Sequence, residues 1–320
     1  MATAADIRSQ VTAQIIAALE GDLVPWRRPW RVSTNSGRPT SIASKNPYSG
    51  VNPLLLDMHS LQHGFRSKWW GTFDQWRRLG LKVKPRPKHV EPGCWGTKIV
   101  FYKPICKTIV DAETGEETKD DFRILRTWSV FNADQVDGNG AERFQVVEEP
   151  GPQPELADFE PARELLDATG ADIRHEGSRA YYRRPTPENT WPNHSHGDFV
   201  VLPPRHTFVA HGAYYETAFH ELGHWSEVRL DWDFRSHGYA ACELVAEIAA
   251  CHLSAELGVP NGESLENHAR YVKDWLSAMR GDASFVFRAA TQASKVTDFL
   301  LSFVRQPASE QQAEAVKQAA

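Results

Sequence analysis

Apolar side chains recur at helical spacing near the start of this 320-residue chain. Over about residues 4–20 they repeat every three or four positions, which predicts an amphipathic helix that Gly21 ends. A second helix should begin near Asn52, and a third should cover residues 73–79 with Thr72 as its N-cap. Short apolar runs between these helices predict strands at residues 81–84, 98–103 and 122–131.

The second half of the chain changes from short strands to long helices. Residues 160–170 should form a helix closed by Gly170. Short antiparallel strands, joined by Pro and Asn turns, are expected at residues 173–175, 180–183 and 197–202. Four helices should follow at about 213–231, 238–257, 264–280 and 283–304. The pattern therefore predicts an α+β protein.

Turn-forming residues divide the chain into modules. An acidic, hairpin-like insertion is expected at residues 111–121, and a Pro-rich segment follows at 147–155. We therefore predict a small α+β domain over residues 1–145, a linker over 146–155 and a second domain over 156–305. The Gln/Ala/Glu-rich residues 306–320 are expected to be disordered.

Charge is distributed unevenly along the chain. Residues 1–105 hold 16 Lys/Arg against 6 Asp/Glu, whereas the remaining residues hold 20 against 35. A basic half joined to an acidic half favours a polyanion-binding module fused to another domain. The four cysteines form no CxxC pair, and no signal peptide or membrane span is visible. A reducing compartment, the cytoplasm, is therefore expected.

Tryptophan and basic residues are interleaved in the N-terminal half. Bases of single strands stack on aromatic rings while Lys and Arg follow the phosphates, so the pattern favours single-stranded nucleic acid over a duplex. The alternative is that most of these tryptophans fill a core that has little Leu and Ile. Composition does not separate DNA from RNA, so the candidate nucleic-acid-binding residues are Trp26, Arg27, Arg28, Trp30, Lys45, Tyr48, Lys68, Trp69, Trp70, Arg77, Arg78, Lys82, Lys84, Arg86 and Lys88.

The sequence His-Glu-Leu-Gly-His at residues 220–224 predicts a metal site. On a helix, His220 and His224 lie on one face and can share one ion, and Glu221 can reach a water on that ion as general base. Metzincins carry a Gly three residues and a His six residues beyond the second His. Glu227 and Leu230 occupy those positions here, which excludes that class.

Gluzincins take their third ligand from a second helix, and the apolar segment 239–250 offers two acids on one face. Glu243, nineteen residues after His224, fits as the third ligand. Glu247, one turn later, fits as the carboxylate that accepts a ring N–H from a ligand histidine. Two alternatives stay open: Glu243 and Glu247 could exchange these roles, or both could be helix charges that face solvent.

The chain resembles the ArdC family of antirestriction proteins over nearly its whole length. The resemblance rests on Pro-Trp at residues 25–26 and 29–30, and on the motifs at 48–52, 70–76, 130–136, 214–225 and 239–250. It implies an N-terminal single-stranded-DNA-binding domain and a C-terminal zincin-like metallopeptidase domain. It also implies a role in shielding incoming mobile DNA from host restriction. The chain departs from the family after His224, where Trp-Ser-Glu-Val replaces the usual Trp-Thr-Gly-His.

Two functions then compete. In the first, the protein protects DNA by occupying single strands, and the metal domain is structural or regulatory. In the second, DNA recruits or activates a metalloprotease that cleaves a host or transfer protein. The ligand set is typical of Zn²⁺, but Mn²⁺, Co²⁺ and Ni²⁺ share it. The sequence specifies neither the protein substrate, the length of DNA bound nor the oligomeric state.

Overall fold

The computed structural model divides into two compact units, each of which is described here by itself. Unit 1 comprises Met1–Pro25 and Pro39–Gln145, and unit 2 comprises Trp26–Arg38 and Val146–Ala320. The structure describes residues 3–21, 23–24, 26, 33–110, 117–146, 159–185, 197–208, 210–232, 234–260 and 266–305, without the side chains of 102–124, 234–235 and 266–270. None of the described helices has the length and apolarity needed to cross a membrane.

The helices of unit 1 follow the predicted periodicity. Helix α1 (Ala4–Glu20) begins at a capping box between Thr3 and Asp6 and buries one apolar stripe, as expected for an amphipathic helix. Helix α2 (Asn52–His63) ends at Gly64, whose φ of 71° suits glycine. Helix α3 (Phe73–Arg78) has Thr72 as its N-cap, again with a capping box.

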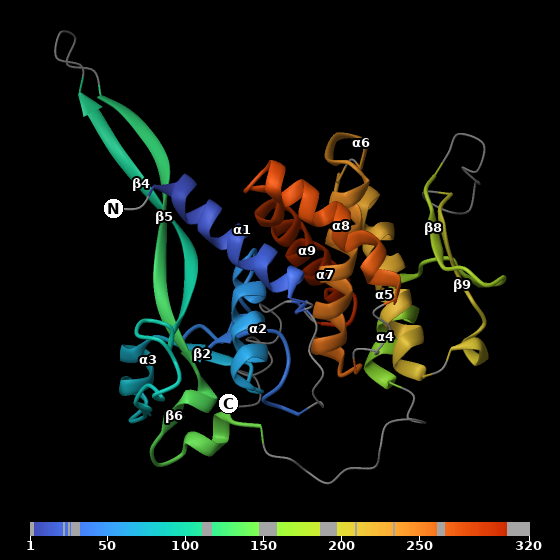
Figure 1. Ribbon diagram of the computed structural model, residues 1–320. Helices are drawn as coiled ribbons and strands as arrows, with labels where there is room; N and C mark the ends of the chain where they lie inside the picture. Colours follow the sequence, from blue (N-terminus) through green and yellow to red (C-terminus); the bar gives the residue numbers. More distant parts are fainter. Residues whose placement is uncertain are drawn as a thin grey trace, which may run out of the picture. The chain divides into compact units, whose positions relative to one another are not determined.

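A four-stranded sheet organises unit 1 in the order β1-β2-β5-β4 (Figure 1). Its strands are β1 (Thr40–Ser41), β2 (Trp69–Gly71), β4 (Thr97–Val110) and β5 (Glu117–Asn132). Strands β4 and β5 pair antiparallel along their whole length and form a long hairpin. Both strands are longer than predicted: β4 extends to Val110, just before the segment expected to be an insertion, and β5 begins at Glu117, inside that segment. A small second sheet pairs β3 (Lys82–Val83) with β6 (Val136–Asp137).

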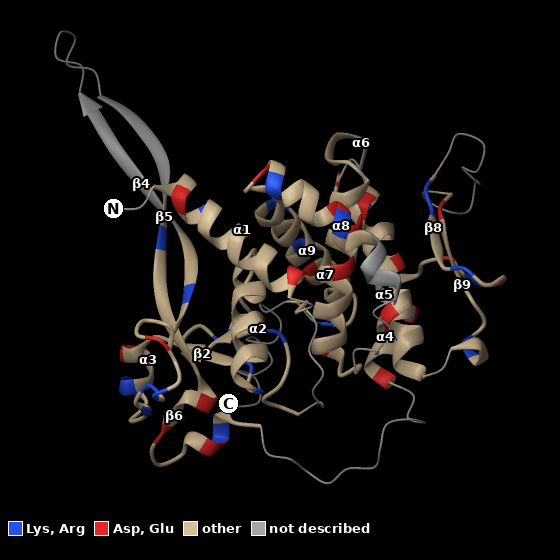
Figure 2. Cartoon of the chain, in the orientation of Figure 1, with Lys and Arg blue, Asp and Glu red and all other residues tan. Residues whose placement is uncertain are grey.

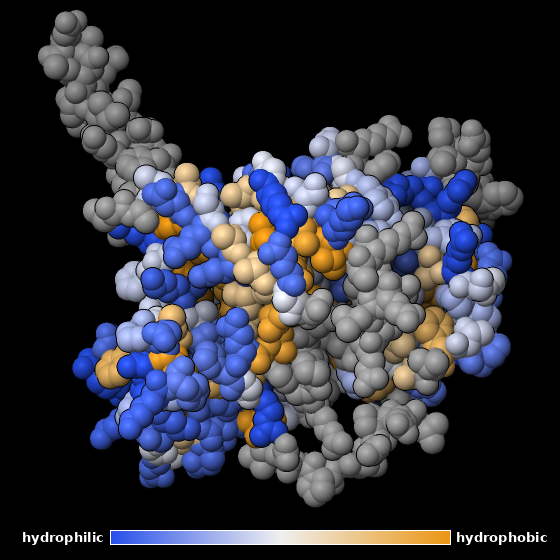
Figure 3. All heavy atoms as spheres, in the orientation of Figure 1, coloured by the Kyte–Doolittle hydropathy of each residue, from blue (hydrophilic) through white to orange (hydrophobic). Residues whose placement is uncertain are grey.

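Tryptophans form much of the core of unit 1. Trp76 is fully buried with Ile42, Leu81 and Val136, and the short 3-10 helices η1 (Ala133–Gln135) and η2 (Ala141–Phe144) contribute further apolar residues. A second cluster packs Trp70 against Leu56, Phe65 and Val130. Figure 3 shows that the surface over α3 is mainly hydrophilic, with a few apolar residues exposed.

Unit 2 begins with helix α4 (Glu160–Thr169), which ends at Gly170 as predicted. A three-stranded sheet follows in the order β7-β9-β8, formed by β7 (Ile173–His175), β8 (Tyr181–Arg183) and β9 (Phe199–Leu202). Strand β8 is antiparallel to β9, as expected, but β7 is parallel to it, so the fully antiparallel prediction was wrong. Strands β7 and β8 run in opposite directions. Strand β9 lies between them in the sheet, so it can be antiparallel to only one of the two.

The four predicted helices are α5 (His211–Arg229), α7 (Tyr239–Leu257), α8 (Glu266–Gly281) and α9 (Phe285–Leu301). Helix α7 packs against α5, α8 and α9 and is nearly all buried from Ala241 to Ser254 (Figure 1). An additional short helix, α6 (Phe234–His237), and the 3-10 turn η4 (Arg205–Thr207) were not predicted. The central position of α7 explains why its sequence is apolar on every side.

The segment Trp26–Arg38 belongs to unit 2, although we had expected residues 1–145 to form one continuous domain. Trp26 is only 1% exposed, and its ring packs edge-on against Trp275 of α8. The buried Arg38 guanidinium pairs with Glu256 at 3.4 Å and with Asp298 at 2.9 Å. Buried apolar area and ion pairs thus tie an N-terminal segment to the C-terminal helices.

Candidate functional site

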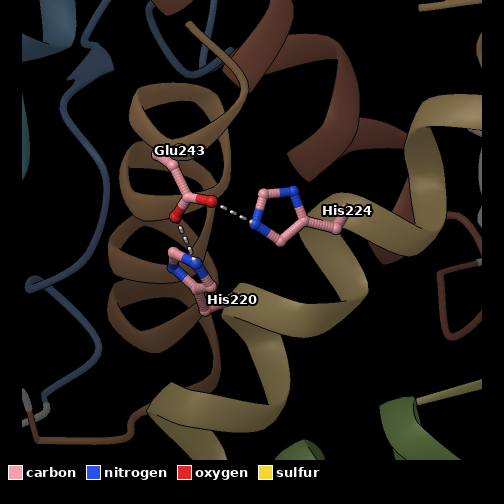
Figure 4. Close-up of side chains that lie close together, drawn as sticks. All are labelled: His220, His224 and Glu243. Carbon is pink, nitrogen blue, oxygen red and sulfur yellow. Dashed lines mark ion pairs between the residues drawn. The ribbon is translucent and has the colours of Figure 1, made fainter. Parts of the chain in front are cut away.

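The predicted ligands come together between α5 and α7 of unit 2 (Figure 4). His220 and His224 are one turn apart on α5, with ring centroids separated by 5.0 Å. The Glu243 carboxylate on α7 faces both rings, 3.3 Å from Nε2 of His220 and 3.6 Å from Nε2 of His224. One donor atom from each residue lies within 4.8 Å of the others.

These three residues fit a single divalent cation. Both imidazoles direct Nε2 toward the same carboxylate, so the donors surround a common point. Two imidazoles and one carboxylate form the His₂Glu set of catalytic zinc sites, in which a fourth position stays open for water or substrate. Because Mn²⁺, Co²⁺ and Ni²⁺ also bind such a set, the donors do not by themselves select one metal.

A second carboxylate orients each histidine. Nδ1 of His220 lies 3.7 Å from Glu247, the acid that the sequence analysis assigned to one of the two ligand histidines. Nδ1 of His224 is 2.9 Å from Glu227, which sequence reasoning had considered only as an exclusion of metzincins. The spacing of the two residues could have predicted this contact, because residues three apart on a helix share a face. A carboxylate on Nδ1 fixes the tautomer and leaves the lone pair on Nε2.

The Glu227 carboxylate is buried and has a positively charged partner. Arg184, which directly follows β8, donates a hydrogen bond to Oε2 of Glu227. Nearby, Arg229 pairs with Asp198 at 2.7 Å, and Asp198 also accepts a hydrogen bond from Tyr182. The three-stranded sheet is therefore linked to the metal-binding helix by buried ionic contacts.

The site shifts the pKa values of its carboxyl groups in opposite directions. Burial by itself would raise the pKa of Glu243, but hydrogen bonds from His220 and His224 hold that pKa well below its usual value. Burial raises the pKa of Glu221, and the neighbouring histidines only partly oppose this. A buried carboxylate with a raised pKa beside a metal site has the properties of a general base.

Tyr239 is a further residue at the site that sequence reasoning did not single out. It lies one turn before Glu243 on α7, and its side chain is 61% exposed. Its hydroxyl is 3.2 Å from that of Tyr271, and burial, Tyr271 and the Glu243 carboxylate together raise the pKa of Tyr239. An exposed hydroxyl next to a metal ligand can donate to a substrate oxygen.

Tyr214, Tyr215, His206 and His211 have side chains of the types that can stabilise an oxyanion, but their positions do not favour that role. Tyr214 and Tyr215 are buried, and the Tyr214 hydroxyl is 3.0 Å from Nε2 of His175. His206 and His211 are exposed, and His211 lies at the first turn of α5, nine residues before His220. Since a helix rises about 1.5 Å per residue, His211 is more than two turns from the ligands.

The predicted DNA-binding residues divide by burial. Trp26 and Trp70 are fully buried and Tyr48 is half-buried, so the two tryptophans pack in cores rather than presenting a ring to a nucleotide. Arg27, Arg28 and Trp30 lie outside the described residues. Of the tryptophans that were candidates for DNA binding, only Trp69 is both described and not fully buried.

Trp69 is the centre of a basic surface cluster in unit 1. The ammonium of Lys45 lies 4.8 Å from the centroid of the Trp69 ring, and that of Lys68 lies 5.2 Å from it. Phe144 contacts Trp69 edge-on and carries the Arg143 guanidinium over its ring. Lys45 is held at a φ of 61°, which is uncommon for a residue with a side chain.

The remaining basic candidates lie around α3 and β3 (Figure 2). Arg78, Lys82 and Lys88 are exposed. Arg77 is exposed and pairs with Asp74, so its guanidinium is less available to a DNA phosphate. Lys84 donates to the backbone carbonyl of Asp134, and Arg86 donates to that of Val90, so both partly serve the fold.

Comparison with known domains divides the chain in the same two parts. Residues 5–131 match the N-terminal domain of anti-restriction factor ArdC. Residues 160–292 match a zincin-like metallopeptidase domain. The solved antirestriction protein ArdC of plasmid R388 is similar in its metal-free form, with 34% identity and a TM-score of 0.70 over 93% of this chain and 97% of that one. Its Mn(II)-bound form gives 32% identity and a TM-score of 0.66 over 93% and 98%.

Relatives with curated sequences show the same extent of similarity. The uncharacterized protein y4eC of Sinorhizobium fredii is 33% identical over 308 residues, which cover 93% of this chain and 92% of that protein. Two DNA primases named TraC from Escherichia coli are 34% and 32% identical over 94% and 92% of this chain. The chain spans only 28% and 20% of those two primases.

Proposed function

This chain belongs to the ArdC antirestriction family, and from that premise we propose that it binds single-stranded DNA and protects incoming mobile DNA from host restriction. The main support for DNA binding is the cluster in which the ammoniums of Lys45 and Lys68 both lie over the Trp69 ring. DNA phosphates attract both ammoniums, and the Trp69 ring helps to hold the two lysines in position. Such a site would act on DNA that enters the cytoplasm of a bacterial host.

The metal centre is the second part of the proposal. His220, His224 and Glu243 would hold one divalent cation, with Glu227 and Glu247 orienting the two imidazoles. Zn²⁺ is the typical occupant of this ligand set, and the Mn(II)-bound form of the R388 protein supports a divalent ion of this class. We infer that the ion stabilises the contact between α5 and α7, whatever further chemistry it performs.

A second function, a DNA-recruited or DNA-activated metalloprotease, is favoured by Glu221. Its carboxylate is 7% exposed, has a raised pKa and lies on the same helix as both histidine ligands. A cation in the site would supply Lewis-acid polarisation of a water and of a peptide carbonyl. Glu221 would accept the proton of that water and pass it to the departing amine. The protein substrate would come from the host or from the DNA-transfer machinery.

Substitutions in the full chain, at one residue of unit 2 and at two residues of unit 1, distinguish the two functions. Glu221→Gln should leave protection and DNA binding intact if protection requires only occupancy of DNA. Lys45→Gln combined with Lys68→Gln should weaken both, because two phosphate-binding charges are lost. Lys273→Gln combined with Lys295→Gln in unit 2 removes the same charge from exposed positions and is the matched control.

Restriction protection of an incoming plasmid and anisotropy of a labelled single strand are the measurements. Wild-type protein that binds no single-stranded DNA would refute the first function. Protection that is lost in Glu221→Gln with DNA binding intact would instead show that protection depends on the metal centre. Cleavage of a peptide library by the metal-loaded wild type, and not by Glu221→Gln, would establish the second function.

A further inference from the structure

Two large aromatic side chains are exposed on the β4–β5 hairpin of unit 1. Trp128 on β5 is 58% exposed and Phe101 on β4 is 53% exposed. This differs from the tryptophans that the sequence singled out, since Trp70 and Trp76 are fully buried. Burying an aromatic side chain is strongly favourable, so two exposed rings on one hairpin require an explanation.

The strand register places the two rings on one face. Ile99 is opposite Trp128, and Phe101 is opposite Arg126. Side chains two residues apart on a strand point the same way, so Phe101 and Trp128 are diagonal neighbours. Such neighbours are separated by about 7–8 Å, which allows each ring to hold its own planar group.

Charge around the rings favours an anionic partner. Arg126 lies across from Phe101 and two residues from Trp128, so its exposed side chain is on the same face as both rings. Figure 2 shows basic residues on both strands in the described part of the hairpin. The sequence contains no Asp or Glu between residues 92 and 110 or between 122 and 133. A flat aromatic partner that also carries phosphates would match both features.

Trp69 serves a different purpose. Two ammoniums already lie over its ring, so it holds Lys45 and Lys68 in position rather than offering a free face. Base stacking requires a ring that no cation covers, and it stabilises the complex for every base because each base has a π-face. The more exposed rings of the hairpin satisfy that requirement better than Trp69 does.

We propose that Phe101 and Trp128 form a stacking platform for two unpaired bases of single-stranded DNA, with Arg126 contacting an adjoining phosphate. The proposal rests on the DNA-binding function proposed above and assigns it a surface. It assigns base stacking to the hairpin and phosphate attraction to both the hairpin and the Lys45–Trp69–Lys68 cluster.

The test uses the full chain and a fluorescently labelled thymidine oligonucleotide. Trp128→Ala and Phe101→Ala should each weaken binding by about tenfold, the order expected for loss of one stacked base. Trp128→Phe should restore most of the affinity, because the ring is kept. Phe73→Ala is the matched control, since Phe73 is 54% exposed and lies on α3 of the same unit.

Salt dependence separates stacking from phosphate attraction. Trp128→Ala should lower the affinity at every salt concentration and leave the slope of log Kd against log salt unchanged. Arg126→Gln should reduce that slope by about one.

Three results would overturn or limit the proposal. If both alanine variants bind as tightly as wild type while the Lys45/Lys68 double variant binds weakly, the platform is refuted and the proposed function survives. If wild type binds no single strand, both fail. If the alanine variants only convert a dimer to a monomer in light scattering, the face is an interface between copies of this chain and the platform is again refuted.

Discussion

Gly223 on α5 packs directly against Ala246 on α7. A methyl group at position 223 would lie 2.9 Å from Cα and 3.0 Å from Cβ of Ala246, closer than side-chain carbons pack. Gly223 lies between His220 and His224, and Ala246 lies between Glu243 and Glu247. The point of closest helix approach therefore sets the distance between the histidines and their carboxylate partners.

Gly223→Ala should push α5 and α7 apart, because the nearest atom is part of the backbone of α7 and cannot rotate away. We expect a loss of about 1–3 kcal/mol in the free energy of unfolding, the usual cost of overpacking. Metal affinity should fall as well, since Glu243 moves from the histidines. Urea unfolding and metal titration measure the two effects. Gly281→Ala, at an open position, is the control and should not destabilise.

Glu227→Gln should weaken metal binding by about 10–100-fold, the usual effect of losing a carboxylate behind a ligand histidine. The amide can still contact Nδ1 of His224 but cannot balance the Arg184 charge. Competition with a chelator measures the metal affinity. Glu164→Gln, at an exposed position on α4, should leave it unchanged. Equal metal affinity in wild type and Glu227→Gln would show that Glu227 only stabilises the fold.

Tyr239→Phe should reduce peptide hydrolysis if the metal centre is a peptidase. The hydroxyl next to Glu243 would donate to the oxygen of the reacting carbonyl, and loss of one such donor costs about 100–1,000-fold in kcat. Metal affinity should stay within a small factor of wild type, because the ligands are unchanged. Tyr181→Phe, on the exposed side of β8, is the control. A fall in metal affinity without a separate fall in kcat would assign Tyr239 to positioning Glu243.

His59 predicts a loss of stability in acid. Burial, with the nearby His63, lowers the pKa of His59 from 6.5 to about 4. Between these values the unfolded chain takes up a proton that the folded chain excludes, so stability falls as the pH falls from about 6.5 to about 4. At pH 5 the loss relative to pH 7 is about 2 kcal/mol.

Urea unfolding of wild type and His59→Leu at pH 7 and pH 5 measures this contribution. The variant should lose about 2 kcal/mol less between the two pH values, whatever its stability at pH 7. His206→Gln, at an exposed position of unit 2, should behave as wild type. An unchanged pH dependence in His59→Leu would show that His59 is protonated in the folded protein.

Local spacing was enough to predict the helices and the pair of histidines. His220 and His224 are four residues apart, and any helix brings such residues to one face. The capping pattern at Thr72 and Gly170 likewise acts within one turn, so both helix boundaries were predictable. Glu243 was predicted as the third ligand because it is one of two acids on an apolar helix. The structure brings its carboxylate to the rings of His220 and His224.

The sequence by itself therefore determined the local chemistry: the helices, their caps and the metal-ligand spacing. Tertiary structure decided which tryptophans are buried, that Arg184 pairs with Glu227, and that β7 runs parallel to β9. It also left Phe101 and Trp128 exposed on a hairpin whose length the sequence did not reveal. Helical spacing depends on residues one turn apart, whereas burial and strand direction depend on segments far apart in the chain, which single-sequence periodicity does not encode.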